Sequence, residues 1–133
     1  MSFKGIAQIA GSAMAAQTVR LNTIASNLAN ADTAGTEDSA YRARKPVFAS
    51  VFDNAGGARV QVLDVINSNE PLNARHEPGH PMADEDGMVF YSNVSPVEEM
   101  TDMMAASRAF STNIDVLSRV NGMQQELLKL GQS

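Results

Sequence analysis

The segment His76-Glu77-Pro78-Gly79-His80 holds the residues whose types and spacing most resemble a catalytic site. It matches H-E-x-x-H, in which two imidazoles on one helical face bind zinc and the glutamate acts as a general base. That geometry requires a helix, but Pro and Gly, the two poorest helix formers, separate the histidines. The chain contains two histidines in all. We therefore predict a rigid turn carrying two solvent-facing histidines, and no catalytic residue, metal or cofactor.

A second candidate, Asp84-Glu85-Asp86-Gly87, resembles the middle of a calcium-binding loop. Met82 stands at the first ligand position, and no Glu follows the Gly after five intervening residues, where a calcium loop requires one. We predict an acidic surface turn. The chain contains no cysteine, which excludes disulfide scaffolds and thiolate chemistry.

The net charge of −5 argues against a nucleic-acid surface, which requires clustered cations. Arg42, Arg44 and Lys45 form the one basic cluster, and their spacing is typical of an exposed strand face. No run approaches 18 apolar residues, so we expect no direct membrane insertion. The opening residues lack the apolar stretch of a cleaved signal peptide, and we expect none.

Two long amphipathic segments, one at each end of the chain, are predicted to form helices that position the residues between them. From Phe3 onward, two rows recur every seven positions: Ala7, Met14, Leu21 and Leu28, and Ala10, Gln17, Ile24 and Ala31. A second stripe lies between Pro96 and Leu130 and consists of Met100, Met103, Phe110, Ile114, Leu117, Val120 and Leu127. Ser95-Pro96-Val97-Glu98 predicts the start of this helix, with Ser95 and Glu98 forming a capping box.

The residues between these helices favour short strands. Tyr41 to Phe52 alternates in part, and Pro46 within it indicates an edge strand or a bulge. A turn at Asp53 to Gly57 leads to a strand over Ala58 to Ile66. Further extended pieces are predicted at residues 72–76 and 88–91.

The fold is therefore predicted to be mainly α with a small β-rich insert (an α+β chain), its long terminal helices paired as an antiparallel coiled-coil-like hairpin. Residues 1–32 form the first helix, residues 33–94 the insert with its loops, and residues 95–133 the second helix, with the two helices forming one domain. Alanine dilutes both stripes and the chain lacks Trp, so the helix pair is predicted to bury little apolar surface. We expect neighbouring chains to complete it.

Asparagines and methionines along the helices leave two interpretations open. Asn22, Asn27, Asn30, Asn113 and Asn121 either face solvent and cap helix ends, or hydrogen-bond across packed helices and fix the register between subunits. The methionines near the stripe of the second helix fill a core or form an adaptable interface.

Three segments resemble the bacterial flagellar basal-body rod proteins. Ser12-Ala13-Met14-Ala15-Ala16-Gln17 and Ser26-Asn27-Leu28-Ala29-Asn30-Ala31-Asp32-Thr33 are similar to the N-terminal signature of that family, and Ala106-Ser107-Arg108-Ala109-Phe110 is similar to its closing helix. Pro78-Gly79-His80-Pro81-Met82-Ala83-Asp84 and the short chain are similar to the C-type proximal rod proteins. Phe110 departs from the Tyr common in the family.

The resemblance implies a non-enzymatic subunit of the proximal rod, the hollow drive shaft that crosses the periplasm and serves motility. It implies export by the flagellar type III apparatus, partners among other rod proteins, basal-body ring and adaptor proteins and copies of the chain, and terminal helices that form the tube's inner layer. We predict an assembly interface made of Met14, Gln17, Leu21, Asn22, Ile24, Asn27, Leu28, Asn30, Met100, Met103, Arg108, Phe110, Asn113, Ile114 and Leu117.

Two other functions compete with this one. A helical-hairpin adaptor or chaperone-like protein also associates through helices, but in a closed complex rather than an open-ended one. A zinc hydrolase requires the H-E-x-x-H segment to be helical.

Overall fold

The computed structural model describes residues 2–132. Its elements in chain order are α1 (Phe3–Ala29), β1 (Ala34–Gly35), β2 (Arg44–Phe52), β3 (Ala58–Asn67), β4 (Asn73–His76), β5 (Met88–Tyr91) and α2 (Pro96–Gly131). The predicted helices and the four longer strands are confirmed to within a few residues.

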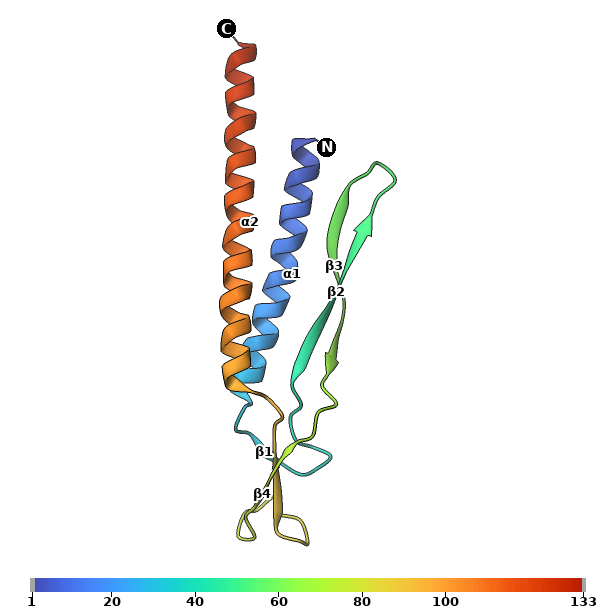
Figure 1. Cartoon of the computed structure of the whole chain (residues 1–133), viewed down its shortest axis with the longest axis vertical. Helices are drawn as coiled ribbons and strands as arrows, with labels where there is room; N and C mark the ends of the chain where they lie inside the picture. Colours follow the sequence, from blue (N-terminus) through green and yellow to red (C-terminus); the bar gives the residue numbers. More distant parts are fainter. Residues whose placement is uncertain (1, 133) are drawn as a thin grey trace.

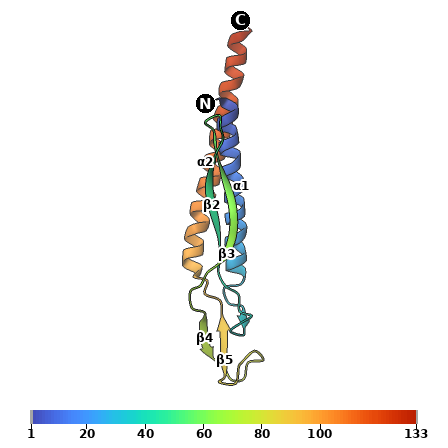
Figure 2. The same cartoon turned by 90° about the vertical axis from the view of Figure 1, so that its right-hand side faces the viewer.

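The two helices pack side by side and run in opposite directions (Figure 1). α1 has 27 residues and α2 has 36, so at about 1.5 Å per residue they are roughly 40 Å and 54 Å long. The last turns of α2 therefore extend past the first turn of α1, as both views show (Figures 1 and 2).

β2 and β3 form an antiparallel hairpin that lies along the other side of α1 (Figure 1). Its turn is closed by Asp53, whose carboxylate accepts hydrogen bonds from the N–H groups of Ala55 and Gly57, and by Gly56 at φ 80°. The register shifts between Val47 and Phe48, next to Pro46. This irregularity is the bulge that the proline predicts.

A three-stranded antiparallel sheet of order β1-β5-β4 lies beyond the ends of the helices (Figure 1). The chain enters it from α1 and leaves it into α2. Ser92 fixes this exit because its hydroxyl donates to the Ala31 carbonyl at 2.8 Å. The helix pair, the hairpin and the sheet thus meet where α1 ends and α2 begins.

The apolar core is thin. Among the described residues, half of the buried apolar positions are alanines, namely Ala10, Ala16, Ala43 and Ala106, beside Ile24, Val89, Tyr91 and Val120. Small side chains let the helices approach closely but each buries little area. The predicted scarcity of buried apolar surface is confirmed.

The predicted fold class was an α+β chain, mainly α, with its helices paired as a coiled-coil-like hairpin; the mainly α description and the coiled-coil-like pairing are wrong. About 48% of the chain is helical and 22% is in strands, which is consistent with α+β. The physical reason is that α1 packs against two partners. α2 contacts one side and the β2–β3 hairpin contacts another, so the buried positions of α1 do not follow a single seven-residue seam. Ala10, Ala16, Thr23, Ile24 and Asn27 are the buried residues of α1.

The predicted start of α2 is correct, but its capping box is not. Pro96 is the first helical residue, while the Ser95 side chain makes no capping hydrogen bond. The Glu99 N–H donates to the Ser95 carbonyl at 3.0 Å, so main-chain atoms close the first turn.

Candidate assembly interface

The H-E-x-x-H segment is a turn. His76 ends β4, and the main-chain N–H groups of His80 and Ala83 donate to the carbonyls of Glu77 and His80, both at 3.0 Å. His80 Nδ1 accepts the Met82 N–H at 3.0 Å and the side chain is half-buried, whereas His76 is exposed. The predicted turn is confirmed, and the prediction of a solvent-facing side chain holds for His76 alone.

Glu77 has a structural contact in this turn. The Tyr91 hydroxyl donates to Glu77 Oε2 at 2.8 Å, and this hydrogen bond raises the pKa of Tyr91. The Arg75 guanidinium lies 4.3 Å from the centre of the same ring. Across residues 2–132, no group of three or more His, Cys, Asp or Glu side chains is arranged to hold a metal ion.

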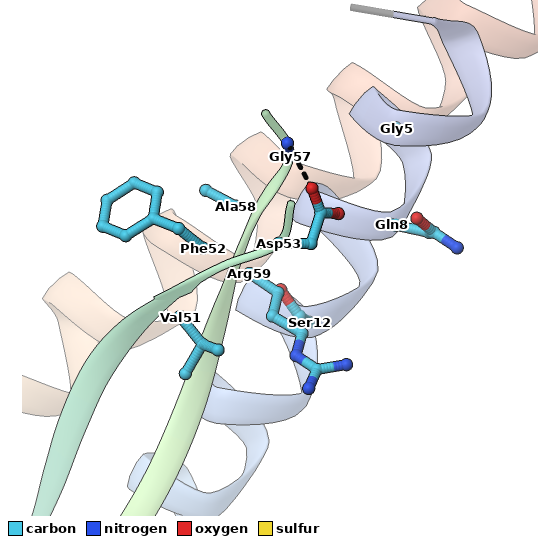
Figure 3. A pocket seen from close by; sticks show the side chains of 9 residues that line it. All are labelled: Gly5, Gln8, Ser12, Val51, Phe52, Asp53, Gly57, Ala58 and Arg59. Atoms are coloured by element: carbon cyan, nitrogen blue, oxygen red, sulfur yellow. Dashed lines mark hydrogen bonds between the residues drawn. The ribbon is translucent and has the colours of Figure 1, made fainter. Parts of the chain in front are cut away.

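An open cleft of about 330 Å³ lies between the first turns of α1 and the tip of the β2–β3 hairpin (Figure 3). Its one hydroxyl in contact with both elements belongs to Ser12, which donates to the Ile9 carbonyl at 2.9 Å and accepts the Val60 N–H at 3.0 Å. The bond from Val60 holds the hairpin against the helix, and the bond to Ile9 orients the hydroxyl within α1. The Phe52 ring is 76% exposed at the rim. These contacts indicate a joint between two elements.

The predicted interface residues of α2 divide into a half-buried set and an exposed set. Met103, Phe110, Asn113 and Leu117 are half-buried, whereas Met100, Arg108 and Ile114 are exposed. The sequence pattern did not separate the half-buried residues from the exposed ones, because residues three or four apart lie on neighbouring ridges of one helical face. Met100 and Ile114 belong to a row of exposed residues on α2, which we call the outer row. Its members are spaced alternately three and four residues apart: Val97, Met100, Met104, Ser107, Ser111 and Ile114.

The predicted interface residues of α1 lie mostly within the subunit. Ile24 and Asn27 are buried, Asn22 is exposed, and Met14, Gln17, Leu21, Leu28 and Asn30 are half-buried. Gln17 Oε1 is buried without a hydrogen-bond partner among the described residues. Asn30 Nδ2 donates to the Ser26 carbonyl at the end of the helix, which is the capping interpretation.

Asn27 is the centre of a polar cluster where α1 meets β2. Only 1% of it is exposed. Its Oδ1 accepts the Arg44 N–H at 2.9 Å and the Tyr41 hydroxyl at 2.8 Å, and its Nδ2 donates to the Arg44 carbonyl at 2.9 Å. The hydrogen bonds of this asparagine are made inside the subunit.

Glu99, in the first turn of α2, is a buried carboxylate beside this cluster, with 6% exposed. Burial raises its pKa, a hydrogen bond with Asn27 opposes the rise, and the Asp102 charge adds to it. Lys45 opposes the rise and Glu98 adds to it. An ionised Glu99 is therefore less favourable in the folded chain than in the unfolded one.

The subunit is accordingly expected to lose stability as the pH rises above the ordinary glutamate value of 4.5. Between the unfolded and the raised folded pKa of Glu99, the folded state binds more protons, so raising the pH favours unfolding. Glu99→Gln should raise the urea midpoint at about pH 7 and leave it nearly unchanged at about pH 4. The matched control is exposed Glu98→Gln. Equal shifts at both pH values would contradict this assignment.

A family model described as flagella basal body rod protein matches residues 8–35, and one described as flagellar basal body rod FlgEFG protein C-terminal matches residues 85–130. The first covers most of α1, and the second covers nearly all of α2. The chain is 45% identical to the flagellar basal-body rod protein FlgC of Escherichia coli O6:H1, over 99% of this chain and 100% of that protein.

The chain belongs to the FlgC family of flagellar basal-body rod proteins. It is also 46% identical to the Salmonella typhimurium FlgC over 99% of this chain, and 32% identical to the Borreliella burgdorferi FlgC over 93% of this chain. This FlgC-family member is a structural subunit of the flagellar basal-body rod, and so serves motility. Neither helix in residues 2–132 combines the length and hydropathy needed to cross a membrane.

Proposed function

We propose that the subunit takes part in the proximal rod, the hollow drive shaft, by packing the uncovered faces of α1 and α2 against neighbouring subunits. The observation that carries this proposal is the outer row of α2. Val97, Met100, Met104 and Ile114 are 75%, 56%, 67% and 44% exposed. Large apolar side chains that recur along one helical face at three- and four-residue intervals are typical of a helix-packing surface.

The end of α2 provides a second uncovered surface. Val120 is buried against the rest of the subunit, and every residue of α2 after it is exposed. The apolar members of this segment are Met123, Leu127, Leu128 and Leu130, with exposures from 45% to 71%. Two uncovered apolar surfaces, one facing away from α1 and one past its end, favour head-to-tail contacts, which produce open-ended assemblies rather than closed dimers.

We also propose a place in the rod for the rest of the chain, and its partners. The protein has no enzymatic role. Residues 1–32 and 95–133 form the axial domain, residues 33–94 face outward, and the predicted interface residues lie at or directly behind the contacts. Its partners are other rod proteins, basal-body ring and adaptor proteins and further copies of itself. It reaches the periplasm through the flagellar type III export apparatus, which accepts unfolded chains, and its thin core suits folding completed by neighbours.

Cysteine protection tests the proposal, because the native chain contains no cysteine. Met104→Cys, on the outer row, should react readily with a maleimide in the purified subunit and be strongly protected in isolated basal bodies. Glu85→Cys, in the exposed loop before β5, is the matched control and should react in both. Equal labelling of Met104→Cys in both states would overturn the proposal. A closed complex of fixed stoichiometry would favour the adaptor function instead.

A further inference from the structure

Residues 43 and 44, at the start of the hairpin, have all four of their main-chain polar groups hydrogen-bonded. Asn27 binds both the N–H and the carbonyl of Arg44 at 2.9 Å. The Ala43 N–H donates to Asn93 Oδ1 at 2.7 Å, and the Ala43 carbonyl accepts the Ser68 N–H at 2.7 Å. Three of the four bonds therefore go to the side chains of two asparagines.

Neither asparagine belongs to the hairpin. Asn27 is in the last turns of α1, and Asn93 lies three residues before Pro96, the first residue of α2. Asn93 Nδ2 also donates to the Glu70 carbonyl at 2.9 Å, beyond the end of β3. The two amides thus connect the base of the hairpin to the end of α1 and to the segment that leads into α2.

Asn27 takes the place of a neighbouring strand. Arg44 is paired with Asn67 of β3, yet its own N–H and carbonyl point to Asn27, so these groups lie on the free edge of β2. Near the hairpin tip, the Val60 N–H of β3 donates to Ser12 of α1. The twist of the ribbon, visible where β2 and β3 cross in Figure 1, turns the edge of β2 to α1 at the base and the edge of β3 to α1 near the tip.

Directional bonds are required here because the hairpin has little else to orient it. A two-stranded ribbon is marginal by itself, and β3 is exposed along its whole second half, from Leu63 to Asn67. Apolar contacts with the small residues of α1 are non-directional. The side-chain amides of Asn27 and Asn93 hold the base of the hairpin, and the Ser12 hydroxyl holds it near the tip. Together these contacts define both the angle and the rotation of the hairpin.

We propose that Asn27 and Asn93 are positioning residues for rod assembly: they set the direction of the β2–β3 hairpin relative to the helix pair. This inference rests on the proposed function, because the hairpin must present its outer side to neighbours at one angle. Neither asparagine has to touch a neighbour itself, and Asn27, at 1% exposure, is inaccessible to one.

The test compares Asn27→Ala with Asn73→Ala, an exposed asparagine of β4 outside the predicted interface. Spin labels on cysteines introduced at exposed Asn54, in the hairpin turn, and at Gln125, on α2, report the hairpin angle. In Asn27→Ala the distance distribution should broaden, and incorporation into basal bodies should fall about tenfold or more at an unchanged amount of exported subunit. Asn73→Ala should change neither the distance distribution nor the amount of subunit incorporated.

An unchanged distance distribution, or normal incorporation, in Asn27→Ala would overturn the inference. If Asn27→Ala fails to fold, Asn93→Ala and Ser12→Ala take its place, because each removes one attachment of the hairpin. A narrow distribution in both of these folded variants would also overturn it. Failure of the proposed function is distinguishable, because it is detected by the labelling of Met104→Cys in subunits with both asparagines intact.

Discussion

Ile114→Asp is expected to abolish assembly while leaving the isolated subunit folded. Ile114 is 44% exposed on the outer row of α2, so the new carboxylate stays hydrated in the free subunit. The free energy of unfolding should then change by no more than about 0.5–1 kcal/mol, which includes the poorer helix propensity of Asp. In the assembled rod the same carboxylate would be buried, unpaired, against a neighbour. Such a charge costs about 3 kcal/mol or more, which weakens association roughly a hundredfold or more.

The measurement is swarming motility in a strain that depends on this subunit, together with the amount of subunit in isolated basal bodies. Thr112→Asp is the matched control, since it adds the same charge to an exposed position of α2 outside the outer row. It should swarm normally. Normal swarming of the Ile114→Asp strain would show that the outer row makes no essential contact.

Ala106→Leu is expected to destabilise the subunit by about 1–3 kcal/mol, the usual cost of forcing extra carbons into a packed site. Ala106 is 0% exposed on α2, and the core around the helices is made largely of alanines, so the helices leave no room for a branched side chain. The helices must separate or α2 must rotate. Either change would also displace the outer row, and motility should fall with stability.

Ala105→Leu is the matched control, because Ala105 is the preceding residue of the same helix and is exposed. Urea unfolding followed by circular dichroism compares the two variants. Ala106→Leu should lower the midpoint clearly, and Ala105→Leu should leave it nearly unchanged, since Leu and Ala are both good helix formers. Equal midpoints for the two variants would contradict close packing of the helices at Ala106.

Much of the local structure follows from residue patterns. The seven-residue rows predict α1, Pro96 predicts the start of α2, and Pro46 predicts the irregularity in β2, which the structure has one residue farther on. Pro78 and Gly79 likewise exclude a helix at the two histidines. In each case the cause is a property of the residue and its near neighbours, such as a missing N–H or a fixed φ angle, so no knowledge of distant contacts is needed.

The assignment of faces required the folded chain. Met100 and Ile114 belong to the same sequence stripe as Met103 and Leu117, and only the position of α1 separates the exposed pair from the half-buried pair. The packing of the hairpin on α1 is likewise the reason why the buried residues of α1 do not follow the single seam of a coiled-coil-like pair. Hydrophobic periodicity identifies a helical face that must be covered, but it does not identify what covers it.

The sequence by itself determined the two terminal helices, the strands between them, the scarcity of large buried side chains and the resemblance to rod proteins. Tertiary structure alone decided that Asn27 binds main chain within the subunit, that Asn93, Tyr41 and Ser12 share in fixing the hairpin, and that Glu99 is buried. The physical reason is range. Helix and turn preferences act over a few residues, whereas hydrogen-bond partners of buried polar groups come from segments up to 61 residues apart, as for Ser92 and Ala31.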